Sequence, residues 1–333
     1  MFSRIPKSSI RAQAPRQISR SVRRFSSLPK AVIVTPEERS SGILSWRSLE
    51  LATRALHHDG IVALENAIPH DKLDFLNEKM VADALFLQSA GDSMPFNYNK
   101  GNIQQNPPLV KRYFDPNIFL NPLATQTTSS LLGPRPRLSF ISGNSALPPA
   151  PDSEPQSQPV HSDADFEHPR SPFALVINIP LVEMTLDNGT TEVWLGSHLN
   201  SGKHVQEGEH GERASGRIRK DVLAARAQER QSSQPVVRKG SIVVRDLRLW
   251  HAGKPNFTEQ TRVMLAMIHF APWFRNAMEI TFSEELRPQL ESDGGLQIQG
   301  RLKPEQEILD TYLKGAYGNA YDFDQKEKLD IEF

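Results

Sequence analysis

The sequence predicts a mixed α+β protein that is mainly β, with a jelly-roll core and helices flanking it on the N-terminal side. Two observations support this fold class. Before residue 137, apolar residues recur at helical spacing, whereas later segments are short, rich in β-branched and aromatic residues, and bounded by Gly, Pro or Asn. Many short strands separated by turn residues are typical of a sandwich or a jelly roll.

Helical spacing of apolar residues predicts helices over residues 46–58 and 70–88, with a strand over 61–68 between them. A polar, Asn-rich stretch then continues as a loop to about residue 118. A third helix is expected over 121–133, where glycine followed by proline ends it.

Six segments of the C-terminal part are expected to be strands. They are RLSFIS (137–142), PVHSDAD (159–165), FALVINIPL (173–181), TEVWLGS (191–197), PVVRKGSIVVRD (235–246) and VMLAMIHFAPW (263–273). Two inserts interrupt them, a Pro-rich one at 147–159 and a charged one at 199–235 that includes a predicted helix over 217–230. Each insert is interpreted either as a lid over a site or as a disordered surface loop.

Composition limits the classes of function. Lys+Arg and Asp+Glu both total 39, which gives a formal net charge of zero and no general attraction to nucleic acid or anionic membranes. No apolar run is long enough for a transmembrane helix. Cysteine is absent, so a metal would need nitrogen and oxygen ligands. We expect one domain over residues 37–333, with a jelly-roll core at about 137–275.

Residues 1–36 differ from the rest of the chain. They are rich in Arg and Ser, and the first acidic residue of the chain is Glu37. This composition is typical of an organelle transit peptide, so we predict a disordered leader with a mitochondrial address. The alternative is a basic tail without an address, in a cytoplasmic protein.

A His-x-Asp pair and a distant histidine form the strongest chemical signal. His161 and Asp163 are two residues apart, so on a strand their side chains face the same side. His251 follows a strand-like run, so its side chain can lie at the same mouth of the barrel as His161 and Asp163. Two imidazoles and one carboxylate are the facial triad of non-heme Fe(II) sites, which leaves further positions open. A lone His-x-Asp pair is common by chance, so the context carries the prediction.

Arg262 lies eleven residues after His251, at the start of an apolar strand. A guanidinium buried there needs an anionic partner, and its planar fork suits a carboxylate. We therefore predict that Arg262 binds a carboxylate co-substrate such as 2-oxoglutarate. The alternative is an ordinary salt bridge at a strand start.

These segments resemble the phytanoyl-CoA dioxygenase family of Fe(II)/2-oxoglutarate-dependent oxygenases. The matching pieces are QPVHSDAD (158–165), DNGTTEVWLGSH (187–198) and GSIVVRDLRLWHAGKPNFTEQTR (240–262). The resemblance implies a cupin-like double-stranded β-helix. It also implies iron bound by His161, Asp163 and His251, and Arg262 as the anchor of the 2-oxoglutarate carboxylate. It implies further that O2 is used to decarboxylate 2-oxoglutarate to succinate and CO2, in a reaction coupled to oxidation of the substrate.

The same resemblance assigns 2-oxoglutarate contacts to Gln158 and Thr191, and more weakly to Asn144. The alternatives are a loop hydrogen bond for Gln158 and an ordinary strand residue for Thr191. Family members that halogenate lose the carboxylate that corresponds to Asp163, and its presence here therefore favours hydroxylation, desaturation or a related oxidation.

The expected substrate is a small organic metabolite, and a homodimer is expected from the resemblance alone. Two other classes remain open. One is a cupin-like metal-dependent isomerase or hydrolase that does not use 2-oxoglutarate. The other is a non-catalytic metal-binding barrel.

Other polar and aromatic residues near the motifs have structural interpretations. We expect His198 to be a structural hydrogen-bonding residue, His269 to lie in the core and Trp250 to pack beside the site. Asp246 either orients His251 as a hydrogen-bond acceptor or forms an ordinary turn.

Overall fold

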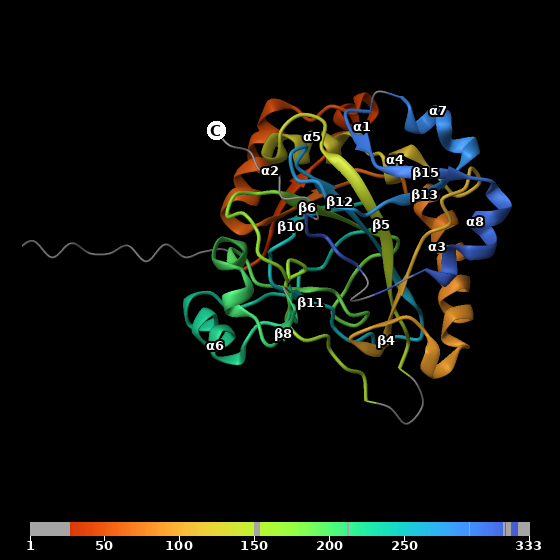
Figure 1. The fold of residues 1–333 in the computed structure, drawn as a ribbon. Coiled ribbons are helices and arrows are strands. Elements are labelled where there is room, and N and C mark those ends of the chain that lie inside the picture. The colour runs from red at the N-terminus through yellow and green to blue at the C-terminus, as the bar shows by residue number, and fades with distance from the viewer. Residues whose placement is uncertain are drawn as a thin grey trace, which may run out of the picture.

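A large, mainly antiparallel sheet forms the centre of the molecule (Figure 1). The computed structural model describes residues 27–149, 154–211, 213–292, 294–315, 317 and 321–325. Across these residues nine strands join one sheet. Eight follow the order β1 (Lys30–Ile33), β2 (Ile61–Glu65), β10 (Ile242–Asp246), β6 (Ala174–Pro180), β12 (Arg262–Phe270), β5 (Arg137–Ala146), β4 (Asn99–Gln105) and β3 (Phe96–Asn97), and β14 (Gln297–Ile298) pairs with β5.

A smaller layer faces this sheet and is held by short pairings. β7 (Glu192–Val193) pairs with β11 (His251–Ala252), and single bridges join His161 to His251 and Val193 to Ser233. Segments far apart in the sequence therefore lie side by side at His251. In the part of the chain that the structure describes, the large sheet ends at β1 and β3 and no pairing closes it into a barrel. The mixed α+β prediction is confirmed.

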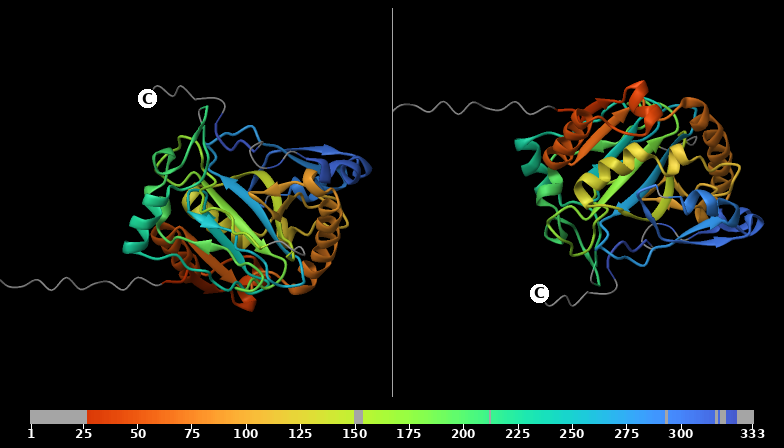
Figure 2. Two further views of the ribbon diagram at one scale, coloured as in Figure 1. Left: turned by 90° about the horizontal axis from the view of Figure 1, so that it is seen from below. Right: turned by 90° about the horizontal axis from the view of Figure 1, so that it is seen from above.

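The three long N-terminal helices form where apolar periodicity predicts them. They are α2 (Trp46–Asp59), α3 (His70–Gln88) and α5 (Pro122–Leu132). They pack on the outer face of the sheet, with contacts from α2 to β2, from α3 to β12 and from α5 to β6 (Figure 2). The other helices are α1 (Pro36–Ser41), α4 (Pro116–Phe119), α6 (Lys220–Glu229), α7 (Arg287–Leu290) and α8 (Glu305–Thr311). None of the described helices is long and apolar enough to cross a membrane.

The end of α2 shows how the local sequence fixes the fold. Gly60 ends the helix with φ 76°, a left-handed conformation that glycine adopts without strain. A Cβ at this position would lie 2.5 Å from Nδ1 of the buried His198. Position 60 therefore requires glycine for both its backbone conformation and its close approach to the buried His198.

The sheet separates an apolar core from a cavity that is lined by both polar and apolar side chains. On β12, Val263, Leu265 and Met267 join the core between the sheet and the helices. The alternate residues of the same strand line a cavity on the inner face, and these are Arg262, Met264, Ala266 and Ile268. This alternation follows from the two-residue period of a strand and places Arg262 on the cavity side.

Three expectations about boundaries need correction. The leader was expected to extend to residue 36, but β1 lies within it and pairs in parallel with β2, so the fold includes residues from Lys30 onward. Residues 1–26, which carry most of the predicted mitochondrial signal, lie outside the described residues. The loop expected before residue 118 contains β3 and β4, which extend the sheet beyond the predicted core of 137–275. Their polar side chains hid these strands from a search for apolar alternation.

The insert at 199–235 is partly built into the small layer. Backbone hydrogen bonds of 2.9 Å join Ser162 to Gly216 and Ile218 to Val160. The insert also contains α6, close to the predicted helix, and two short strands, β8 (Glu209–His210) and β9 (Arg213–Ala214). After β12 the chain forms a further two-stranded sheet from β13 (Ile280–Ser283) and β15 (Gly300–Lys303).

His269 should make stability sensitive to acid. It is buried in β12 beside Thr128, whose Oγ1 lies 2.8 Å from Nδ1, and burial lowers its pKa to about 3. The folded state therefore binds fewer protons than the unfolded state, so stability present above the ordinary histidine pKa of 6.5 is lost as pH falls toward 3. We expect His269→Gln to remove up to about 1.4 kcal/mol per pH unit from the slope of unfolding free energy between pH 6 and 4. Denaturant unfolding at several pH values measures this slope, and equal slopes for both proteins would contradict the assignment.

Candidate active site

A cavity of about 1000 Å³ lies between the large sheet and the small layer. The inner faces of β5, β6, β10 and β12 line one side, and residues of the His-x-Asp segment and β11 line another. Three aromatic residues near the C-terminus, Tyr317, Tyr321 and Phe323, also line it. The cavity is large enough for a co-substrate and a small organic molecule together.

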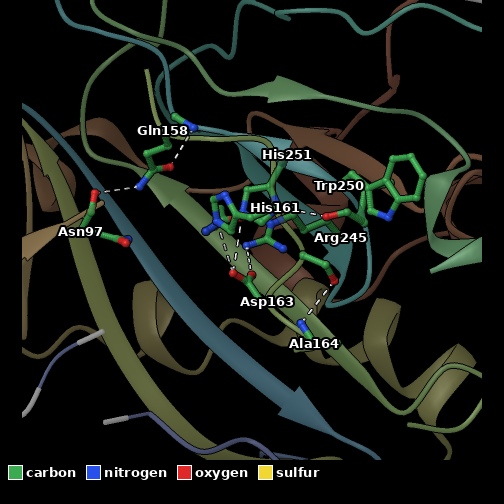
Figure 3. Close-up of polar contacts among 12 residues, drawn as sticks. Asn97, Gln158, His161, Asp163, Ala164, Arg245, Trp250 and His251 are labelled. Carbon is green, nitrogen blue, oxygen red and sulfur yellow. Dashed lines mark hydrogen bonds and ion pairs between the residues drawn. The ribbon is translucent and has the colours of Figure 1, made fainter. Parts of the chain in front are cut away.

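His161, Asp163 and His251 meet at this cavity (Figure 3). Nε2 of His161 lies 3.7 Å from Oδ1 of Asp163, and Nε2 of His251 lies 3.8 Å from the same oxygen. One ligand atom from each residue lies within 4.8 Å of the other two. The backbone bridge between His161 and His251 explains this convergence, because it sets the two histidines directly opposite each other.

Both imidazoles are oriented by the backbone. Nδ1 of His161 lies 2.9 Å from the carbonyl of Pro159, and Nδ1 of His251 lies 2.9 Å from the carbonyl of Leu249. A carbonyl can only accept, so each Nδ1 carries the proton and each Nε2 presents a lone pair to the shared point. Burial lowers the pKa of both histidines, which favours the neutral form that a metal requires.

Arg245 keeps the carboxylate of Asp163 ionised. Burial alone would raise the pKa of Asp163, but the charge of Arg245 and the hydrogen bond that it donates hold this pKa well below its usual range. Nη2 of Arg245 donates to Oδ2 of Asp163 at 2.7 Å, and Nε donates to Oδ1 of Asn178 at 3.0 Å. The second carboxylate oxygen of Asp163 therefore faces the histidines as an ionised ligand. Two neutral imidazoles and one carboxylate fit a ferrous ion.

Arg262 lies in the same cavity wall and is almost fully buried, with 2% of its surface exposed. Nη2 donates to the carbonyl of Gly189 at 2.9 Å, whereas Nη1 is buried and has no hydrogen-bond partner among the described residues. Burial lowers its pKa to about 10, so it remains charged at neutral pH. A buried cation with an unsatisfied donor fits an anionic ligand and does not fit the alternative of a strand-start salt bridge.

Gly189 allows the backbone to reach Arg262. It has φ 79°, and a Cβ there would lie 2.3 Å from the carbonyl oxygen of Lys254. No other residue fits between these two backbone segments without displacing one of them. The glycine of the DNGTT segment thus fixes the carbonyl that orients the guanidinium.

Gln158 and Thr191 both line the cavity. The Gln158 amide is already used for support, since its Oε1 accepts from the backbone of Gly253 at 2.8 Å and its Nε2 donates to Asn97 at 3.4 Å. Asn144 also lines the cavity. Contact of these residues with 2-oxoglutarate stays a prediction.

Two functional features were missed in the sequence. Arg245 faces the cavity from near the end of β10, directly after three apolar residues, where a buried charge requires a partner, and this position could have identified it. The ring of Tyr98 packs at a tilt of 45° against His161 with centroids 4.7 Å apart, but Tyr98 lies in a polar stretch that was interpreted as a loop.

The interpretation in which Asp246 orients His251 is wrong. Asp246 forms a buried ion pair of 2.7 Å with Arg248, and a backbone carbonyl orients His251 instead. Trp250 packs with Trp194 in a small apolar cluster outside the cavity lining, as its structural interpretation predicted.

Solved structures of similar fold include a non-heme monooxygenase, EctD and an epimerase. The non-heme monooxygenase ThoJ in its apo form matches with a TM-score of 0.51 and 20% identity, over 78% of this chain and 92% of that chain. EctD from S. alaskensis with 2-oxoglutarate and 5-hydroxyectoine matches with a TM-score of 0.50 and 21% identity, over 79% and 89%. The epimerase SnoN with Fe3+, alpha ketoglutarate and nogalamycin RO matches with a TM-score of 0.50 and 17% identity, over 68% and 84%. At these identities the likeness shows a shared fold.

The sequence match to a family is more extensive. The family model described as Phytanoyl-CoA dioxygenase (PhyH) matches residues 56–264. This range is more than half of the 333 residues and includes the metal triad, Arg245 and Arg262. The chain therefore belongs to the phytanoyl-CoA dioxygenase family.

Proposed function

We propose that this protein is an Fe(II)- and 2-oxoglutarate-dependent dioxygenase. It oxidises a C–H bond of a small organic substrate by hydroxylation or desaturation, and it releases succinate and CO2. The proposal includes a double-stranded β-helix as the scaffold, formed by the large sheet and the small layer. The fold of the structural neighbours supports this description.

One observation carries the proposal: the triad and an unsatisfied buried guanidinium line one cavity. The triad alone would suit many divalent metals and many reactions. Arg262 adds a fixed positive charge with a free donor in the same cavity. A metal-chelating acid with a second carboxylate satisfies both groups at once, and 2-oxoglutarate is such an acid.

Each residue has a distinct task in this proposal. His161, Asp163 and His251 hold the ferrous ion, which supplies the O2 chemistry when bound. Arg262 binds the far carboxylate of 2-oxoglutarate and sets its register, and in this proposal Gln158 and Thr191 contact the same molecule from the cavity wall.

The chain also protects the reaction from solvent. The triad histidines are buried, with 5% of His161 and 7% of His251 exposed. Tyr321 and Phe323 stack edge-on against Phe140 on the inner face of β5 and cover part of the cavity. Excluding water in this way limits side reactions and holds the substrate C–H close to the metal.

Succinate formation tests the proposal directly. The protein loaded with Fe(II) is expected to form succinate from 2-oxoglutarate only in the presence of O2, slowly on its own and faster with substrate. Zn(II)-loaded protein is the matched control, because the metal fills the site without redox chemistry. Turnover of a substrate under anaerobic conditions without 2-oxoglutarate would instead support a cupin-like isomerase or hydrolase. Absence of any succinate from fully Fe(II)-loaded protein would support a non-catalytic barrel.

A further inference from the structure

Arg245 has an unused donor beside the metal site. Its side chain lines the cavity and only 7% of the residue is exposed. Nη2 and Nε are bound to Asp163 and Asn178, but Nη1 is buried and has no hydrogen-bond partner among the described residues. If Arg245 served only to pair with Asp163, a buried guanidinium nitrogen without a hydrogen-bond partner would be an unnecessary cost.

The charges around the cavity leave room for one more anion. The ferrous ion brings two positive charges, and Arg245 and Arg262 bring one each. Asp163 and a bound 2-oxoglutarate supply three negative charges, so one positive charge is uncompensated. The other charged residues of the lining balance each other, because Arg213 pairs with Asp165 at 2.8 Å and the exposed Arg217 accompanies the exposed Glu207. A net charge in a buried site favours a ligand of the opposite sign.

Apolar side chains continue from Arg245 across the inner face of the sheet. The strand register places Arg245 opposite Val176, Val176 opposite Ile268, and Ile268 opposite Phe140. These four side chains line the cavity in one row, which spans about 14 Å at the usual spacing between strands. Tyr321 and Phe323 pack against Phe140 at the far end of this row.

The two cavity arginines lie at different levels of the sheet. Arg262 opens β12 opposite Ala146, whereas Arg245 is level with Ile268, six residues further along the same strand. Six residues of a strand span about 20 Å. The far carboxylate of a 2-oxoglutarate bound at Arg262 therefore does not also satisfy Nη1 of Arg245.

From this geometry we propose that the organic substrate carries a carboxylate, which Arg245 binds through Nη1 beside the metal site. The apolar body of the substrate lies along Val176, Ile268 and Phe140. Tyr321 and Phe323 cover its far end. The inference rests on the proposed function, since it assigns the substrate class of that same site. Arg245 is then a specificity residue as well as the residue that holds Asp163.

Binding of paired probes tests the proposal. The probes are ω-phenyl carboxylic acids with two to six methylene groups and their primary amides, which share shape and differ in charge. Calorimetry is performed anaerobically on protein saturated with Fe(II) and 2-oxoglutarate, so that Arg262 is already occupied. We expect at least one acid to bind about tenfold or more tightly than its amide, and Arg245→Gln to reduce this preference to within about twofold.

The ratio of the acid affinity to the amide affinity distinguishes recognition of the substrate carboxylate by Arg245 from structural support of Asp163. A purely structural role of Arg245 would weaken the acid and the amide equally and leave their ratio unchanged, and that outcome overturns the proposal. An absence of binding by every acid to the wild type overturns it as well. Arg262→Gln, studied at raised 2-oxoglutarate concentration, is the matched control and should keep the preference for the acid.

Failure of the proposed function gives a different result. If the wild-type protein bound Fe(II) but no 2-oxoglutarate in the first step of the titration, the co-substrate assignment would fail before any probe was added. If 2-oxoglutarate bound and no acid was preferred over its amide, only the assignment of Arg245 would fail.

Discussion

Asp163→Ala is expected to lower substrate oxidation by at least about 1000-fold and Fe(II) affinity by at least about 100-fold. The side chain supplies the only carboxylate of the described three-residue cluster, at 3.7 and 3.8 Å from the two histidine nitrogens. Loss of a group that merely supports a metal ligand reduces affinity about 10–100-fold, and loss of the ligand itself exceeds this. Iron content after dialysis and the rate of succinate formation measure the two effects.

The same substitution should destabilise the metal-free protein. Asp163 neutralises Arg245, whose side chain is 9% exposed, and its removal leaves that charge without an anionic partner. Breaking a buried pair in this way costs about 3 kcal/mol of unfolding free energy, whereas replacing both partners by apolar groups costs much less. The double variant Asp163→Ala/Arg245→Met should therefore be more stable than Asp163→Ala alone. Full activity of Asp163→Ala would refute the ligand assignment.

The amino-acid sequence predicts the long helices and the metal ligands well, because both predictions depend largely on residues that are close together in the chain. α2, α3 and α5 carry apolar residues at helical spacing, and this local pattern survives in the fold. His161 and Asp163 are two residues apart, and they converge although the strand expected over 159–165 is reduced to single bridges at His161, with Asp163 in a bend. The meeting of this pair with His251 is a long-range contact, which the sequence supports through the strand-like run before His251 and through family resemblance.

The parts that the sequence does not predict depend on contacts between distant segments. β1 looks like the end of a basic leader until its parallel pairing with β2 is known. β4 carries polar residues, of which Gln104 lines the cavity, so apolar alternation is weak there and the strand is recognised only by its pairing with β5. Asp246 lies close to His251 in sequence, but its ion pair with Arg248 removes it from the site.

Arg262→Met is expected to raise the KM for 2-oxoglutarate about 100-fold or more. The guanidinium is 2% exposed and has one free donor, so it contributes both charge and directed hydrogen bonds to a carboxylate. Hydrogen bonds to charged groups contribute about 1.5–3 kcal/mol each, and two of them reach this factor. Arg262→Lys keeps the charge and loses the fork, so its KM should rise by a smaller factor of about tenfold. Initial rates of succinate formation against 2-oxoglutarate concentration give these values.

Stability measurements distinguish this role of Arg262 from a structural one. In the absence of ligand, Arg262→Met should unfold within about 1 kcal/mol of the wild type, because removal of an uncompensated buried charge offsets the lost hydrogen bonds to Asn188 and Gly189. With Fe(II) and saturating 2-oxoglutarate, the wild type should gain stability and the variant should gain much less, since only a ligand that binds the folded state shifts unfolding. An equal gain in both proteins would place the far carboxylate of 2-oxoglutarate away from Arg262, and a large loss of stability without ligand would make Arg262 a structural residue of the β12 start.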